Sequence, residues 1–476
     1  MDLLEQFLNF EKDNDLFSRT YCGELYWHMM RFIVFEKIRT AKDPSTSAYD
    51  KLFRTRRTML DKIKVLVRLC VFVLDQLVHR RLRKADILVN AQNNYRDIDG
   101  VLTDTLMDPL SEHFNMQPVY IDVDFWKPLI RKYPSCAGGM LRHFFYSVRH
   151  KVFKKHVDSV EEGFLATIID IVKREFGIEI SELAVSTRFN SIFCKAFSIY
   201  VRKILKKVRP KAVLTGCHYG INVFILTREA KRLGIPVIEL QHGVIGRKHL
   251  SYNFIDIAGS AAYFPDYILT FGDYWTENIR LPRGVKAITA GSTYMESRSK
   301  NLRHIVRSEK TIVFYSGIDS LLIDILVQFS GIAKKNGYEV VCKMHPRECG
   351  DWRNLYPTLE TQDIEIIDDN MDIYKLFFRG RHHVGVASTT LFEAIATGGM
   401  VHAHSSGRSY MSDMVEAGAV KEFTSAEELM KNIIEINEDQ TAERNRQVAN
   451  QLYEPNALEN QINAIRKIMS TCKQND

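Results

Sequence analysis

The sequence lacks the patterns that mark several specialised classes of protein. Its eight cysteines are scattered and form no C-x-x-C pair, which argues against a disulfide framework or a cysteine zinc site. Neither G-x-G-x-x-G nor G-x-x-x-x-G-K-[ST] occurs, so no motif favours a dinucleotide-dependent oxidoreductase or a P-loop NTPase. Hydrophobic residues make up 45% and charged residues 26% of the 476 residues, which is typical of globular domains and excludes disorder, collagen or coiled coil for most of the chain.

Long hydrophobic runs are also missing. The most apolar stretch, residues 63–78, contains Lys64, Arg68 and Asp75 and is too short to span a bilayer. The first fifteen residues are rich in acids and contain no apolar segment, which predicts that there is no secretory signal peptide. Together with the scattered cysteines, these absences predict a cytoplasmic protein.

The charge of the chain is unevenly distributed. The formal net charge is +7, of which +10 lies before residue 212 and −3 after it. The basic part includes residues 51–84, where apolar residues recur at helical spacing. This pattern predicts a peripheral contact with the anionic inner face of the cytoplasmic membrane, and the alternative is a packed helix with a solvated basic face. The basic stretches lack interleaved aromatic residues, so we expect no nucleic-acid partner.

Strand and helix patterns alternate in two successive parts of the chain, which predicts an α/β protein with parallel sheets. A mainly helical insertion at about 137–209 interrupts the first part, and the charged stretch 296–310 is predicted to be a linker. The predicted units are a helical N-terminal extension at 1–84, a first α/β domain at 85–295, a second at 296–440, and terminal helices at 441–476.

Within these units the hydrophobic periodicity predicts individual elements. Residues 91–100 are predicted to be a polar loop. The predicted strands are 87–90, 118–123, 212–215, 236–240, 267–271, 287–290, 311–315, 338–344, 364–367, 383–387 and 400–404. The predicted helices are 103–114, 220–233, 320–335, 372–378, 390–397, 425–437 and 442–470.

Ligands of parallel sheets bind beyond the carboxyl ends of the strands, so the loops at those ends are the candidate sites. Lys343-Met-His345-Pro346-Arg347 follows a predicted strand and places an imidazole beside two cations. Such groups suit the neutralisation or protonation of a phosphate leaving group. The alternative is a polar surface turn.

A second loop, Ser388-Thr389-Thr390, leads from a strand into a helix, with Glu393 one turn further on. Hydroxyl and backbone N–H groups at a helix N-terminus bind anions, and Glu393 is placed to accept ribose hydroxyls. The alternative is a capped helix with Ser388 or Thr389 as its N-cap and Glu393 as a surface acid. Ser316-Gly317, after an earlier strand, offers a third close approach to phosphate.

In the first α/β part, the segment Glu239-Leu-Gln241-His242-Gly243 ends a strand with polar residues. We predict that His242 acts as a base or orients an acceptor hydroxyl, and that Glu239 polarises His242 or acts itself. Gln241 and Gly243 belong to the same acceptor side.

The first predicted strand–helix loop contains Arg96, Asp97 and Asp99. The two carboxylates suit the removal of a proton from a sugar hydroxyl, and Arg96 is assigned to the acceptor side. The paired histidines His382-His383 and His402-x-His404 are explained by strand alternation, because no carboxylate or cysteine stands at matching ligand spacing. No metal site is therefore predicted.

Three of these segments resemble motifs of bacterial GT-B glycosyltransferases: Gln241-His242-Gly243, Lys343-Met-His345-Pro346, and Ser388 to Gly398. The similarity is to the capsule and lipopolysaccharide group, comprising sialyl- and polysialyltransferases, Kdo transferases and CDP-glycerol polymerases. The resemblance implies two Rossmann-like domains facing a cleft, with the donor nucleotide in the C-terminal domain and the acceptor on the N-terminal one. In this resemblance His345-Pro346 matches the family's HP motif, and Ser388-Thr389 matches its phosphate motif.

The stretch from Arg96 to Pro109 also resembles the first loop and helix of capsule-biosynthesis proteins. The acidic-acidic-Gly motif that carries the base of sialyltransferases is spaced differently here, as Asp97-Ile-Asp99-Gly100.

Together, these features predict a metal-independent glycosyltransferase without a cofactor. It is expected to transfer a sugar from a nucleotide-sugar to a growing capsule or O-antigen polysaccharide, on a lipid-linked or oligosaccharide acceptor. The donor sugar, and whether stereochemistry is retained or inverted, stay open. The alternatives are a sugar-nucleotide epimerase of the same architecture and a non-catalytic glycan-assembly protein.

Overall fold

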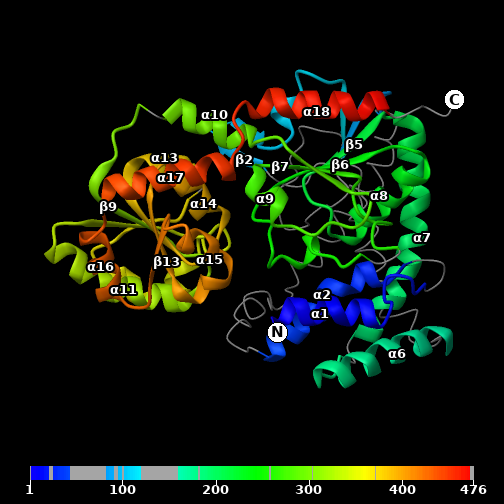
Figure 1. The fold of residues 1–476 in the computed structure, drawn as a ribbon, viewed down its shortest axis with the longest axis horizontal. Helices are drawn as coiled ribbons and strands as arrows, with labels where there is room; N and C mark the ends of the chain where they lie inside the picture. Colours follow the sequence, from blue (N-terminus) through cyan, green and yellow to red (C-terminus); the bar gives the residue numbers. More distant parts are fainter. Residues whose placement is uncertain are drawn as a thin grey trace.

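A computed structural model describes residues 2–20, 25–42, 82–90, 95–98, 101–119, 159–180, 183–256, 259–302, 304–369 and 371–471 (Figure 1). Its helices are α1 (Leu3–Asp13), α2 (Trp27–Lys42), α6 (Ser159–Phe176), α7 (Leu183–Val208), α8 (Ile221–Arg232), α9 (Asp273–Glu277), α10 (Thr293–Leu302), α11 (Ser320–Lys335), α12 (Trp352–Leu355), α13 (Ile373–Arg379), α14 (Thr389–Ala396), α15 (Arg408–Glu416), α16 (Ala426–Ile434), α17 (Glu438–Leu452) and α18 (Ala457–Thr471). Short 3-10 turns are η3 (Asp108–Leu110), η4 (Leu250–Tyr252), η5 (Pro357–Thr361) and η6 (Ser405–Gly407).

Two six-stranded parallel sheets form the framework, and they confirm the predicted α/β class with two Rossmann-like parts. The first sheet has the strand order β4-β1-β5-β6-β7-β8. Its strands are β1 (Ile87–Asn90), β4 (Met116–Val119), β5 (Ala212–Thr215), β6 (Val237–Leu240), β7 (Tyr267–Thr270) and β8 (Lys286–Thr289). β1, β5 and β6 are buried along their whole length, as expected for a parallel sheet covered on both faces.

The second sheet has the order β11-β10-β9-β12-β13-β14, which is the 3-2-1-4-5-6 order of dinucleotide-binding Rossmann sheets. Its strands are β9 (Ser308–Tyr315), β10 (Glu339–Lys343), β11 (Glu365–Ile367), β12 (Gly380–Gly385), β13 (Met400–His404) and β14 (Val420–Phe423). The order reverses between β9 and β12, and sheets of this kind bind ligands beyond the carboxyl ends of the strands at such a point.

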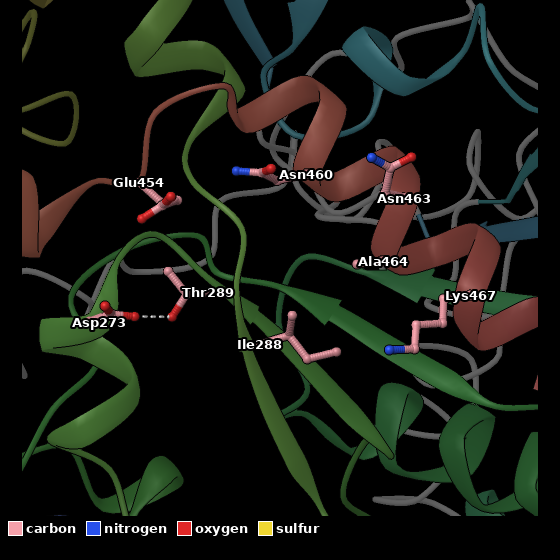
Figure 2. Close-up of a pocket in the computed structure, with 8 residues that line it drawn as sticks. All are labelled: Asp273, Ile288, Thr289, Glu454, Asn460, Asn463, Ala464 and Lys467. Atoms are coloured by element: carbon pink, nitrogen blue, oxygen red, sulfur yellow. Dashed lines mark hydrogen bonds between the residues drawn. The ribbon is translucent and has the colours of Figure 1, made fainter.

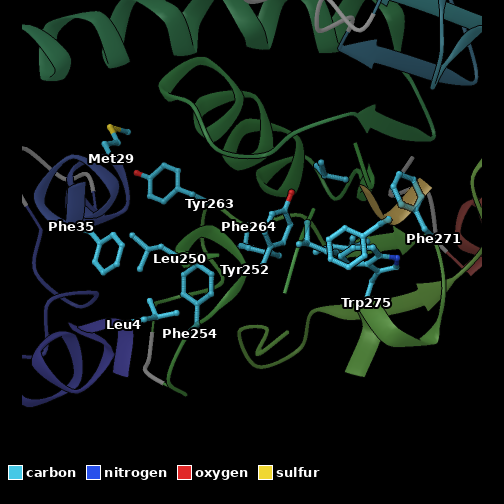
Figure 3. Close-up of a cluster of buried hydrophobic side chains, with 14 of the residues drawn as sticks. Leu4, Met29, Phe35, Leu250, Tyr252, Phe254, Tyr263, Phe264, Phe271 and Trp275 are labelled. Atoms are coloured by element: carbon cyan, nitrogen blue, oxygen red, sulfur yellow. The ribbon is translucent and has the colours of Figure 1, made fainter. Parts of the chain in front are cut away.

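A buried ion pair joins the N-terminal helices α1 and α2, and its arginine also binds the first domain. Arg31 donates to both carboxylate oxygens of Glu11, at 2.8 Å each, and also to the carbonyls of Leu250 and Asn253. Figure 3 shows side chains of these helices packing against the 250–254 segment, in an apolar cluster that continues to Trp275. The predicted helical N-terminal extension therefore shares a hydrophobic core with the first sheet.

The chain crosses between the two sheets a second time near its end. α17 packs beside α14 of the second domain, whereas α18 returns to the first sheet and buries Ile462 and Ile465 against it (Figure 1). The crossing is tight, because a Cβ on Gly291 would lie 2.4 Å from the carbonyl oxygen of Glu454. Gly291 also has a φ of +84°, so both the close contact and the backbone conformation exclude a side chain there.

The predicted helix at 103–114 is wrong. Residues 95–98 (β2) and 101–104 (β3) form an antiparallel hairpin instead, so part of the predicted polar loop at 91–100 is a strand. A turn follows, in which the carboxylate of Asp104 accepts from the N–H groups of Leu106 and Met107. Such local side-chain bonds compete with helical hydrogen bonds, and here they hold the backbone in a turn.

The predicted linker at 296–310 is also wrong for most of its length, because α10 and β9 occupy it. α10 buries Tyr294 and Arg298, and Arg298 donates to Asp372 at 2.7 Å. The partly buried Glu296 accepts from the N–H of Ala457 at 2.8 Å. The predicted helix at 442–470 is interrupted by a turn in which Asn456 has a φ of +57°. The sequence reading also missed α15 and β14.

In the part of the chain that the structure describes, no helix is both long and apolar enough to cross a bilayer. Most of the predicted basic amphipathic helix, residues 51–81, lies outside the described residues. The predicted insertion at about 137–209 is helical where it is described, as α6 and α7.

Candidate functional site

The loop after β6 is held rigidly by Gln241. This buried side chain donates from Nε2 to the carbonyl of Gly243 at 2.8 Å, and its Oε1 accepts from the N–H of Phe271 at 2.7 Å. One amide group therefore ties the ends of β6 and β7 together. It fixes the backbone of the His242–Gly243 turn.

A carboxylate lies beneath this turn. Glu239 has 0% of its surface exposed and accepts hydrogen bonds from Tyr252 Oη at 2.5 Å and His218 Nδ1 at 2.7 Å. Burial alone would raise the pKa of Glu239, but the neighbouring His218 and its hydrogen bond hold that pKa below its usual value. Glu239 is therefore a buried anion that acts on its neighbours and has no surface for a substrate.

His242 lies above Glu239 and is partly accessible. Its Nδ1 is 3.8 Å from Glu239 Oε1, and its Nε2 is 3.0 Å from Tyr219 Oη. Burial lowers the pKa of His242, with Glu239 opposing the shift, so the imidazole is neutral near pH 7 and able to take up a proton. Burial also lowers the pKa of the adjacent His249, to about 4.

The two sheets meet at this turn. The hydroxyl of Thr389, in the first turn of α14, accepts a hydrogen bond from the N–H of Val244 at 3.1 Å. A Cβ added to Gly243 would lie 3.3 Å from the same hydroxyl oxygen, so the glycine allows this close approach. The structure thus brings together two segments that the sequence analysis selected separately, the Gln-His-Gly turn and the Ser-Thr-Thr loop.

Ser388 and Thr390 flank Thr389 and are, like it, partly exposed. Ser388 is the N-cap residue of α14, but its side chain makes no capping hydrogen bond. The simple capped-helix alternative therefore does not describe this loop. The hydroxyl of Thr389 faces the junction of the two domains.

The His345-Pro346 turn lies at the end of β10, two strands from β12 in the same sheet. His345 Nδ1 accepts from the N–H of Arg347 at 3.2 Å, which leaves the ring proton on Nε2. Burial lowers the pKa of His345, with Glu348 opposing the shift. Pro346 and Arg347 are exposed, whereas Lys343 is buried and donates to the carbonyls of Met344 and Asp369.

Ser316 does not face outward as its predicted phosphate role suggests. It is buried, donates to Glu348, and accepts from the N–H of His345 at 2.8 Å. The following residues Gly317 and Ile318 both have a positive φ, of +61° and +62°. A left-handed conformation at a β-branched residue is rare, and it lies here at the point where the strand order reverses.

Glu393 is also largely buried, with 8% of its surface exposed. It accepts a hydrogen bond from Tyr374 Oη at 2.8 Å, and its charge acts on Tyr315 and Tyr453 by raising their pKa values, which burial raises most. The structure places Glu393 among tyrosines one turn below Ser388–Thr390, rather than on the surface.

The remaining predicted residues belong to the β2–β3 hairpin. The backbone of Arg96 and Asp97 pairs with Thr103 and Leu102, but their side chains are not described, and Asp99 lies outside the described residues.

Sequence reasoning missed His218, Tyr219 and Tyr252. His218 and Tyr219 lie in the loop after the predicted strand 212–215, so the rule that ligands bind beyond the carboxyl ends of parallel strands applied to them as well. Tyr252 had no comparable signal, because only the fold brings it beneath β6.

The paired histidines form no metal site in the part of the chain that the structure describes. His382 Nδ1 and His402 Nε2, on neighbouring strands, are 3.1 Å apart. No three His, Cys, Asp or Glu side chains among the described residues converge as ligands.

A separate surface pocket of about 480 Å³ lies beside the crossing from α17 to α18. Figure 2 shows the residues that line it, including Asp273, Thr289, Glu454 and Lys467. Thr289 donates to Asp273 at 2.6 Å. None of the predicted site residues lines this pocket.

No protein-family model and no curated relative matches this sequence. Solved structures with a similar fold include a UDP-GlcNAc 2-epimerase from Neisseria meningitidis (15% identity, 59% of this chain and 81% of that one, TM-score 0.41). Others are MurG from Acinetobacter baumannii (14%, 58% and 79%, TM-score 0.39) and the wall teichoic acid polymerase TagF (13%, 55% and 73%, TM-score 0.37). Likeness at this level concerns the fold alone.

Proposed function

We propose that this protein is a glycosyltransferase that transfers a sugar from a nucleotide-sugar to a growing surface polysaccharide, a capsule or O-antigen, carried on a lipid. The observation that carries the proposal is the contact of Thr389 with Val244. It places an anion-binding type of loop from one sheet beside a neutral histidine from the other. A donor phosphate and an acceptor hydroxyl bound to these two segments are then neighbours.

On the donor side, the N–H and hydroxyl groups at the start of α14 stabilise negative charge on the departing diphosphate. His345 carries its proton on Nε2, because Nδ1 accepts from Arg347 N–H, and so donates to a phosphate oxygen. Arg347 is exposed next to it and adds a positive charge. These residues supply the charge that the leaving group needs.

On the acceptor side, His242 is the base. The buried Glu239 carboxylate favours a proton on Nδ1 of His242, so the lone pair on Nε2 faces Tyr219 Oη. Burial is the main cause that raises the pKa of Tyr219, so the phenol keeps its proton at neutral pH. We infer that the acceptor hydroxyl gives its proton to Nε2, directly or through the Tyr219 hydroxyl.

A thermal-shift screen with UDP, CDP, GDP and CMP tests the donor role. A nucleotide that binds the native state at 100 times its Kd stabilises the protein by about 2.7 kcal/mol. We expect one of the four to raise the melting temperature and the others to have little effect. A protein that responds to none of them would overturn the proposal.

Incubation with the matching nucleotide-sugar alone then separates the two kinds of enzyme. A transferase releases nucleotide only when acceptor is added, whereas an epimerase converts the donor by itself. Conversion of the sugar in the absence of acceptor would favour the epimerase.

A lipid-linked acceptor requires contact with the membrane, and we propose that α7 contributes to it. Lys195, Lys203 and Lys206 are exposed on this helix, together with Ile199. Lysines near an anionic bilayer each contribute about 1 kcal/mol of attraction. Co-sedimentation with phosphatidylglycerol vesicles at low salt is expected, with loss at high salt, whereas a protein that stays in the supernatant contradicts this contact.

A further inference from the structure

The end of β10 and the end of β9 are joined through one buried side chain, Glu348. It has 0% of its surface exposed and accepts three hydrogen bonds. The donors are Ser316 Oγ, the N–H of His345 at 3.1 Å, and Tyr356 Oη at 2.5 Å. This carboxylate therefore connects the HP turn, the loop after β9 and the segment leading into η5.

The hydrogen bonds around Glu348 hold the loop after β9, which contains an unfavourable backbone conformation at Ile318. Gly317 and Ile318 are both left-handed, and the loop closes with a hydrogen bond from Asp319 N–H to the carbonyl of Ser316 at 3.1 Å. A β-branched residue keeps this conformation only where its surroundings impose it, and such strain clusters at binding sites. Ser316 is the residue through which Glu348 restrains this loop.

The first domain contains a parallel arrangement. Glu239 lies three residues before His242, and Glu348 lies three residues after His345. Each glutamate is fully buried and accepts from a tyrosine hydroxyl at 2.5 Å, from Tyr252 in one case and Tyr356 in the other. Each of the two histidines of the proposed site therefore lies in a turn next to a buried carboxylate.

We infer that Glu348 is a positioning residue of the donor site, which holds the His345 turn and the strained Gly317–Ile318 loop in the geometry that binds a nucleotide phosphate. The inference rests on the proposed donor role of these loops. Glu348 itself touches no ligand, because it has no exposed surface. Its effect passes through Ser316 and the backbone of His345.

The test is the affinity of the variants for whichever of UDP, CDP, GDP or CMP stabilises the wild type. Glu348→Gln keeps the size of the side chain but replaces one of its two acceptor oxygens with an NH₂ group, which leaves at least one of the three donors without its acceptor, so we expect affinity to fall about tenfold. Glu360→Gln is the matched control, since Glu360 lies nearby on η5 and only forms an exposed pair with Arg353. It is expected to bind like the wild type.

A double-mutant cycle with His345→Ala distinguishes positioning from a general loss of stability. Because Glu348 holds the turn that orients the His345 imidazole, its loss matters less once the imidazole is absent, so the losses in the double variant are less than additive. Additive losses, or wild-type affinity in Glu348→Gln, would overturn the inference while leaving the proposed function intact. A wild-type protein that binds none of the four nucleotides overturns both.

If Glu348→Gln does not fold, Tyr356→Phe replaces it in the same cycle. This change removes one of the three donors, so affinity is expected to fall about threefold. Unchanged affinity in Tyr356→Phe would then count against the inference.

Discussion

The hydroxyl oxygen of Thr389 lies 3.1 Å from the backbone nitrogen of Val244, although 145 residues separate them in the chain. The bond joins the first turn of α14 to the loop after β6, and so joins the ends of strands from two different sheets. An anion held by α14 would lie next to His242, two residues before Val244. The chemistry proposed for this protein depends on this contact.

Replacing Thr389 with valine tests the contact directly. The change keeps the shape of the side chain but leaves the N–H of Val244 without its acceptor, so the free energy of unfolding is expected to fall by about 1–3 kcal/mol. Nucleotide affinity falls as well if the hydroxyl binds phosphate. Thr397→Val, at the other end of α14, is the control, because that hydroxyl donates only within its own helix. Equal behaviour of the two variants in urea unfolding and nucleotide titration would contradict the prediction.

His242→Asn is expected to lower kcat by about 10²–10⁴-fold, the range for loss of a general base. Nucleotide binding is expected to change little, because the proposed phosphate donors are the groups of α14 and of the His345 turn. The measurement is the acceptor-dependent release of nucleotide, together with a binding titration. His304→Asn, in an exposed position, is the control and retains full activity. A kcat within threefold of the wild type in His242→Asn would exclude His242 as the base.

Acid is expected to destabilise the second domain. Burial, followed by the charges of Arg381 and Lys310, lowers the pKa of His382 to about 4, and burial keeps that of His402 well below its usual value. Because these folded-state values lie below about 6.5, stability is complete above pH 6.5 and is lost as the pH falls from 6.5 towards 4. The loss is about 1.4 kcal/mol per pH unit for each histidine.

Urea unfolding between pH 7 and pH 4.5 measures this slope. In His382→Asn the free energy of unfolding is expected to change less steeply with pH, because one of the buried histidines is missing. The variant is also expected to be less stable than the wild type at pH 7. The exposed His304→Asn keeps the slope of the wild type. Identical slopes in all three proteins would show that His382 does not titrate as its burial requires.

The ion pair between Glu11 and Arg31 is expected to hold the N-terminal helices on the first domain. Glu11→Gln leaves the guanidinium buried without a counter-charge, so the free energy of unfolding falls by about 3–5 kcal/mol. Glu5 also lies on α1 and forms an exposed pair with Arg280, so Glu5→Gln is expected to change the free energy of unfolding by less than about 1 kcal/mol. Urea unfolding followed by tryptophan fluorescence compares the two. Similar losses would mean that the buried pair has no special role.

Secondary structure could be predicted well where local patterns act alone. The strands 212–215 and 400–404 and the helix 320–335 agree with the structure to the residue. The helix begins after Asp319, whose carboxylate caps it by accepting from Leu322 N–H. The predicted helix at 103–114 was wrong because the side chains of Asp104 and Asp108 form hydrogen bonds with nearby backbone N–H groups. Hydrophobic periodicity does not show such bonds.

The candidate site could be predicted in part. The strand-end rule found His242, His345 and Thr389, because parallel strands place such residues at one edge of a sheet. It left Glu239 either to polarise His242 or to act itself, and it gave Ser316 a direct contact with phosphate, whereas the structure buries both beneath the turns that they support. Burial depends on which segments cover a residue, and neither the sequence of β6 nor that of β9 contains this information.

The sequence by itself determined the class of the protein, two parallel α/β units, and the strand ends that carry its polar residues. These properties follow from hydrophobic periodicity and turn chemistry, which act over a few residues. Only the tertiary structure decided the strand order of each sheet, the packing of α18 on the first sheet, and the bond between Thr389 and Val244. Contacts between residues far apart in the chain depend on how whole helices and sheets pack, and no local pattern specifies them.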